Sequence, residues 1–179
     1  MNKLTDAFFL LLLMANVVRA QGTVLWTNFF SSIKAQTNST QLSPFFGGGS
    51  TTGGVGYLAN GSTGSKFYFA LLYSAFAGTN ISAPTTLGQL STWQFTGLMA
   101  TNANSGTASP VNPSFAATVP WAGGTTNNIL LAGWSANLGN SWASVSNLLF
   151  NFNLADNNSY FFGVSPAGYL KAGTGTPGT

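Results

Sequence analysis

The sequence predicts an all-β fold, an antiparallel β-sandwich of the jelly-roll or Ig-like kind, with one short helix near residues 141–149. Short stretches rich in Phe, Tyr, Val and Leu recur between clusters of Gly, Ser, Thr, Asn and Pro. This spacing is typical of sandwiches and barrels. The chain is 45% hydrophobic and 14% aromatic, which supplies a core and argues against disorder. A length of 179 residues fits one domain.

The candidate strands follow from the apolar stretches, and they cover residues 23–30, 66–73, 93–100, 114–119, 128–134, 150–154 and 160–164. Apolar and small or polar side chains alternate with period 2 over 114–119 and 150–154, so each of these strands should have one buried face. Residues 66–73 are apolar on both faces after Lys66. We therefore expect this strand in the middle of the sheet, with packing on either side.

Between these strands, one stretch has helical spacing. Ser141 is a suitable cap, and Trp142, Val145, Leu148 and Leu149 then fall on one face. The glycine-rich residues 47–64 and the polar residues 101–113 are expected to be mobile loops. Residues 156–158 suit a hairpin turn.

The N-terminal residues 1–20 have the pattern of a secretory signal peptide. Lys3 precedes an apolar run over residues 7–18, and Ala20 suits a cleavage site. A run this short spans roughly 18 Å as a helix, against about 30 Å of membrane hydrocarbon. We therefore expect a mature chain with no stable membrane span that is secreted or held at the cell surface. Residues 21–171 form the expected domain, and residues 172–179 a Gly, Thr and Pro-rich tail or linker.

Charge is scarce, because only 4% of the chain is charged and it has no His and no Cys. The charged residues beyond residue 20 are Lys34, Lys66, Asp156 and Lys171. Paired carboxylates, a Ser/His/Asp triad, a Cys nucleophile and a His or Cys metal cage are all excluded for this part of the chain. We expect no enzyme activity, no metal and no cofactor. Without a basic patch, we expect no nucleic acid partner.

Ser31 and Lys34 form the one pattern with catalytic meaning, S-x-x-K, found in penicillin-recognising enzymes. Those enzymes also carry S-D-N and K-T-G elements, and neither occurs in this sequence. The pattern is best explained as chance in a Ser-rich chain. Catalysis remains the least favoured interpretation.

The five tryptophans suggest carbohydrate binding, because flat aromatic faces stack on sugar rings. Trp26, Trp93 and Trp134 lie in candidate strands, where large aromatics usually fill the core. Trp121 follows a proline and precedes Gly123 and Gly124, so we expect it to be the most exposed. Trp121 and then Trp142 are the candidate ligand-binding residues.

Three segments carry a resemblance to known proteins: AQGTVLWTN at 20–28, the stretch 67–79, and ILLAGWSANLGNSW at 129–142 with the glycine-rich end at 173–178. Together they resemble a group of small secreted bacterial proteins, common in Verrucomicrobia, many of which carry a PEP-CTERM sorting tail. The resemblance implies export, a β-rich fold and a link to the cell surface or exopolysaccharide. No Pro-Glu-Pro, hydrophobic anchor or basic end follows Thr179, so we expect either free release or a fragment of a longer protein.

Two functional hypotheses follow. The first is an exported, non-catalytic surface or extracellular-matrix protein that associates with itself or with exopolysaccharide. Low net charge and strand edges without lysine favour such association. The alternative is a carbohydrate-binding module that uses exposed Trp or Tyr side chains.

Overall fold

The computed structural model describes residues 21–26, 46–47, 67–79, 81–102, 108–112, 116–151 and 161–175. The predicted all-β, sandwich-like fold is confirmed. The strands are β1 (Gln21–Leu25), β2 (Phe46–Gly47), β3 (Phe67–Ala75), β4 (Gln94–Asn102), β5 (Ala108–Asn112), β6 (Ala116–Ala122), β7 (Thr126–Ser135), β8 (Phe161–Val164) and β9 (Gly168–Lys171). The helices are α2 (Leu87–Leu90), the 3-10 helix η1 (Ala136–Leu138) and α3 (Trp142–Asn151).

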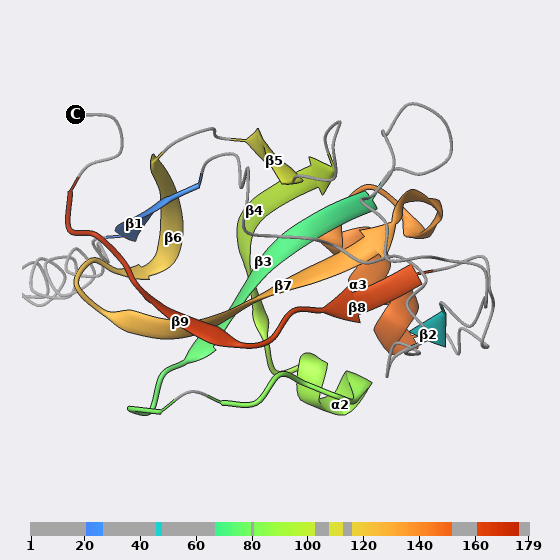
Figure 1. The fold of residues 1–179 in the computed structure, drawn as a ribbon, viewed down its shortest axis with the longest axis horizontal. Coiled ribbons are helices and arrows are strands. Elements are labelled where there is room, and N and C mark those ends of the chain that lie inside the picture. The colour runs from blue at the N-terminus through green and yellow to red at the C-terminus, as the bar shows by residue number, and fades with distance from the viewer. Residues whose placement is uncertain are drawn as a thin grey trace, which may run out of the picture.

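The strands form two antiparallel sheets. Seven strands make the main sheet in the order β2-β8-β7-β3-β4-β5, and β9 pairs with β7 beyond the end of β8 (Figure 1). β1 and β6 make a separate two-stranded ribbon. Figure 1 also places α2 at the end of the sheet where β3 finishes and β4 starts.

The strand β3 lies in the middle of the main sheet, as its two apolar faces predict. It pairs with β7 along its whole length and with β4 on the other side. Ala70 and Leu72 are buried on one face, and Phe69 and Leu71 on the other. Both faces of the sheet are therefore covered.

Different elements cover the two faces. On the first, Leu90 of α2, Leu138 of η1 and Val145 of α3 pack against the sheet. On the second, Val24 of β1 and Val119 of β6 bring the ribbon onto it. Each face has its own apolar cluster, which follows from the period-2 alternation of the strands.

The predicted helix is confirmed with a longer C-terminal end. The backbone N–H of Ser144 donates to the Ser141 hydroxyl at 3.2 Å, so Ser141 caps the helix as expected. The prediction of a strand over 150–154 is wrong at its start, because Phe150 and Asn151 belong to α3. Asn151 donates from Nδ2 to Oδ1 of Asn147 at 2.6 Å, a contact one helical turn long.

Two boundaries also differ from the predictions. Residues 101–113 were expected to be a loop, but β4 runs to Asn102 and residues 108–112 pair with its edge as β5. The expected tail begins too early, since Ala172 is 2% exposed and Gly173 exchanges backbone hydrogen bonds with Thr23 of β1. Both boundaries are set by pairing with strands that are distant in the sequence, and no local sequence pattern shows such pairing. The predicted signal peptide, the hairpin at 156–158, Ser31 and Lys34 lie outside the described residues.

Candidate functional site

Trp121 is buried, so the expectation that it is exposed is wrong. Its side chain is 7% exposed and packs in the cluster under the ribbon, with its ring 5.1 Å from that of Tyr73 between centroids. β6 continues three residues past its predicted end, and Trp121 follows Ala117 and Val119 onto the inward face. Pro120 occupies an outward position of β6, whose partner among the described strands is β1. Proline is tolerated in such an edge position.

Trp142 is also buried, at 8% exposure. It lies on the apolar face of α3, where its ring centroid is 6.0 Å from that of Trp134 and 6.4 Å from that of Phe95. Neither predicted ligand-binding tryptophan presents a ring face to solvent. The core assignment of Trp26, Trp93 and Trp134 is confirmed, with exposures of 3%, 7% and 0%.

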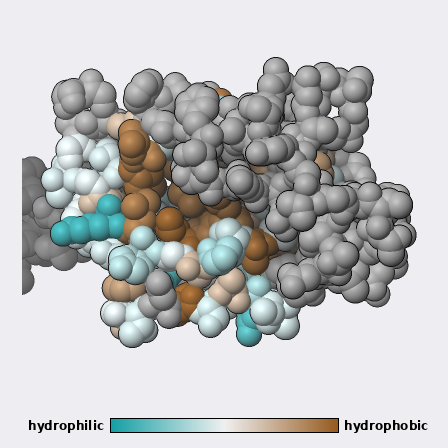
Figure 2. All heavy atoms as spheres, viewed as in Figure 1, coloured by the Kyte–Doolittle hydropathy of each residue, from teal (hydrophilic) through white to brown (hydrophobic). Residues whose placement is uncertain are grey.

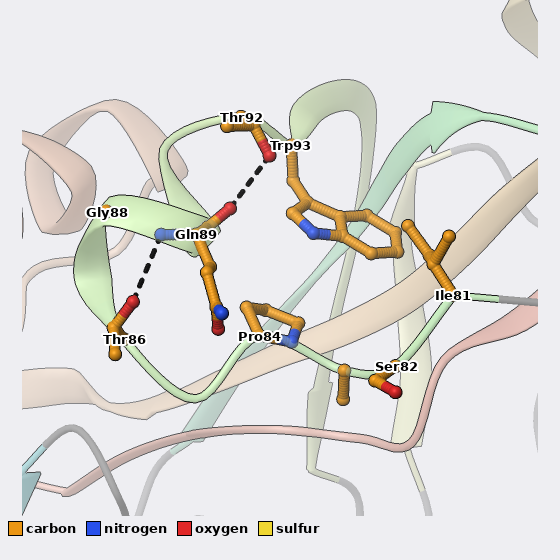
Figure 3. Close-up of a pocket in the computed structure, with 9 residues that line it drawn as sticks. Ile81, Ser82, Pro84, Thr86, Gly88, Gln89, Thr92 and Trp93 are labelled. Carbon is orange, nitrogen blue, oxygen red and sulfur yellow. Dashed lines mark hydrogen bonds between the residues drawn. The ribbon is translucent and has the colours of Figure 1, made fainter.

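An open groove of about 500 Å³ lies instead along the segment that joins β3 to β4. Sequence reasoning did not find it. Figure 3 shows its lining, which is uncharged throughout. The lining residues are Ile81, Ser82, Ala83, Pro84, Thr86, Gly88, Gln89, Thr92 and Trp93.

The short helix α2 positions the polar side of this groove. Thr86 is the N-cap residue, and its hydroxyl accepts from the backbone N–H of Gln89 at 3.2 Å. Leu90 is 0% exposed and anchors the helix in the core. The sequence signal was Thr86 followed three residues later by Gln89, the spacing of a capping box.

The Gln89 side chain turns back to the residue before the cap. Its Oε1 atom accepts from the Thr85 backbone N–H at 2.8 Å and from the Thr85 hydroxyl at 3.2 Å. A backbone N–H can only donate, so the atom that faces it must be the oxygen of the amide. The Nε2 group of Gln89 has no partner in the described part of the chain, which leaves it as a donor in the groove.

Trp93 combines a core position with an accessible nitrogen. Its ring belongs to the apolar cluster on the α2 side of the sheet. The two side-chain polar atoms that are both buried and unpartnered in the described residues are Trp121 Nε1 and Asn128 Oδ1. Among the described residues Trp93 Nε1 also lacks a partner, but it is not one of these buried atoms, and Trp93 lines the groove. In Figure 3 this nitrogen is on the side of the ring that faces Pro84 and Gln89.

The groove holds no group suited to proton transfer or metal binding. Lys171 is the single charged side chain in the described ranges, and it lies on β9. Within the same ranges, no three His, Cys, Asp or Glu side chains come together. The groove can therefore bind through shape, apolar contact and neutral hydrogen bonds. None of the described helices has the length and hydropathy of a membrane span.

Comparisons with protein-family models, with curated proteins and with solved structures find no significant match to this chain.

Proposed function

We propose that this protein is an exported, non-catalytic component of the cell surface or extracellular matrix that binds neutral polysaccharide in the groove beside α2. The observation that carries the proposal is the pair of unpartnered donors, Gln89 Nε2 and Trp93 Nε1, in an uncharged groove. Sugar hydroxyls and carbonyls accept such hydrogen bonds, and apolar patches of sugar rings pack on the exposed Ile81 side chain. When a neutral polymer binds to a surface without charges, no charged group has to be removed from water.

Export is part of the proposal and is supported by residues 1–20, with their basic start, apolar run and small residue before the expected cleavage site. The resemblance to secreted bacterial proteins points the same way. A protein that meets polysaccharide outside the cell needs no catalytic group, which agrees with the near absence of ionisable side chains.

A groove-filling substitution tests the proposal. A Cβ atom at Gly88 would meet nothing closer than Thr86 Oγ1 at 4.0 Å, so Gly88→Leu places a side chain in open space at the groove. We expect retention on neutral polysaccharides in affinity electrophoresis to fall to background, with the free energy of unfolding unchanged or raised by up to about 1 kcal/mol.

The matched control is Gly168→Leu. This glycine on β9 also has nothing within 4 Å of an added Cβ, and it lies outside the groove. Retention should be unchanged in this variant. Equal retention of the wild type and Gly88→Leu on every neutral polysaccharide tested would refute the groove as the binding site.

Self-association is a second candidate function, favoured by the exposed apolar side chains. Leu25 is 72% exposed on the ribbon, Val111 is 48% exposed on β5, and Tyr169 is 60% exposed on β9 beside Phe76. Among the coloured residues on the face seen in Figure 2, strongly hydrophilic areas are few and small. Such a surface lacks the charges that keep proteins apart.

Light scattering of the purified protein tests this second function. We expect assemblies larger than a monomer at physiological salt. Leu25→Lys on the ribbon should shift the distribution towards monomer, because a charge on an exposed strand opposes association. A wild-type protein that stays monomeric at high concentration would remove self-association.

A further inference from the structure

We infer that the groove beside α2 selects polysaccharides that carry acetamido groups, such as polymers of N-acetylated amino sugars. This inference rests on the proposed function and names its substrate class. It follows from two observations. The free polar groups of Gln89 and Trp93 are hydrogen-bond donors, and apolar side chains lie in the same groove.

Gln89 and Trp93 present only donors. The Oε1 atom of Gln89 is occupied by two hydrogen bonds from Thr85, so its free group is the Nε2 amide nitrogen. An indole nitrogen never accepts, and Trp93 Nε1 has no partner among the described residues. A ligand that matches both groups must bring acceptor oxygens. An acetamido carbonyl oxygen is an acceptor of this kind.

Two of the three hydroxyl groups in the groove already form hydrogen bonds within the protein, and the third is available to a ligand. Thr92 donates its hydroxyl hydrogen to the Gln89 carbonyl at 2.8 Å, and the Thr86 hydroxyl accepts from the Gln89 backbone N–H. Ser82 is exposed and has no partner in the described part of the chain, so its oxygen is available for the acetamido N–H. Each polar atom of an acetamido group thus has a partner of the right type.

Apolar side chains lie on either side of the Trp93 ring. Ile81 is 37% exposed and Pro84 is buried beside the Trp93 ring, as Figure 3 shows. The methyl of an acetamido group is apolar and gains by leaving water against such a surface. A hydroxyl group at the same sugar position has no methyl to bury, and its oxygen already forms hydrogen bonds with water. The groove therefore distinguishes the two groups.

Two insoluble β-1,4-linked polymers provide the test, since chitin carries an acetamido group where cellulose carries a hydroxyl. We expect the purified wild-type protein to bind chitin at least about tenfold more tightly than cellulose, and to bind soluble N-acetylchitotriose but not cellotriose in calorimetry. The variant Gln89→Glu keeps the acceptor oxygen for Thr85 and loses the Nε2 donor. It should weaken N-acetylchitotriose binding about tenfold or more.

Gln94→Glu is the control. It makes the same chemical change on β4, outside the groove, where Gln94 Oε1 accepts from the Tyr73 hydroxyl. It should bind like the wild type. Equal binding of chitin and cellulose, both abolished by Gly88→Leu, would overturn this inference and leave the proposed function standing. Binding to neither polymer would overturn this inference, and the proposed function would fall with it only if retention on every other neutral polysaccharide tested were also at background. Binding of a proline-rich peptide with N-acetylchitotriose inert would assign the groove to a protein partner instead.

Discussion

Trp93 and Trp121 are exposed to the same extent, 7%, yet their nitrogen atoms have opposite surroundings. Both rings pack in an apolar cluster, Trp93 on the α2 side of the main sheet and Trp121 beneath the ribbon. In the described part of the chain the Trp121 nitrogen is buried without a partner, whereas the Trp93 nitrogen is not among the buried atoms and Trp93 lines the groove. The fraction of a side chain that is exposed therefore does not identify a binding residue. Which atom is exposed does.

The difference comes from the elements that carry the two residues. Trp121 is inside β6, where alternation turns every second side chain inward and the sheet closes over it. Trp93 comes directly before β4, next to a helix of four residues. A short connection covers one side of the ring and leaves its edge open. Sites on connections held by a rigid sheet are common for this reason.

The largest effect is expected from Trp121→Ala, which should change the stability of the protein but not its affinity for sugar. Trp121→Ala should lower the free energy of unfolding by about 3–5 kcal/mol, because it empties a buried indole site. Urea denaturation followed by circular dichroism measures the loss. N-acetylchitotriose affinity, measured below the unfolding transition and corrected for the folded fraction, should be unchanged. A weakened affinity in the folded protein would place Trp121 in the binding site. Trp93 and Trp121 would then not differ in function.

A smaller effect is expected when the Trp93 nitrogen alone is removed. Trp93→Phe keeps an aromatic ring in the core but deletes the donor, so affinity should fall about tenfold. The unfolding free energy should fall by about 1–2 kcal/mol, since part of the buried ring is lost. Calorimetry and urea denaturation give the two numbers. Full affinity in this variant would show that the nitrogen does not contact the ligand.

The third prediction compares the sealed nitrogen with a paired one. Trp134 donates from Nε1 to the Gly139 carbonyl at 2.9 Å, so Trp134→Phe leaves that carbonyl without its donor. Trp121→Phe instead removes a donor that has no partner among the described residues. Trp134→Phe should therefore be more destabilising, by about 1 kcal/mol. Equal urea midpoints for the two variants would mean that the Trp121 nitrogen has a partner in solution.

The smallest effect is expected from pH. The chain has no His and no Cys, so no side chain is present whose ordinary pKa lies between 5 and 8. Stability and sugar affinity should both stay constant, within error, across this range. A bell-shaped or sigmoidal dependence of affinity on pH would require a titrating group. Binding through neutral hydrogen bonds and apolar contacts alone involves no such group.

The sequence was informative where one local pattern decides the structure. The apolar stretch at 66–73 predicted the central strand β3, and Ser141 with its spaced apolar residues predicted α3. It misled at Phe150, where alternation over a few residues competed with a helix already under way. It misled again at Trp121, because the proline before it suggested a loop although the alternation from Ala117 continued.

The groove was harder to predict. The Thr86 and Gln89 spacing is a helix-start signal that could have located α2. The open side of Trp93 has no such signal, because its strand-like setting predicts burial, which is also observed. The edge of the ring that reaches solvent depends on how the connection between β3 and β4 lies against the sheet. This is a tertiary property.

Titration of the tryptophan indole N–H resonances is the most direct test of the central claim. The five tryptophans give five indole signals in a ¹H–¹⁵N spectrum of the labelled protein, assigned by single Trp→Phe variants. On addition of N-acetylchitotriose, we predict a saturable shift of the Trp93 signal and a stationary Trp121 signal. A stationary Trp93 signal at saturating sugar, or a Trp121 shift as large as that of Trp93, would contradict the account.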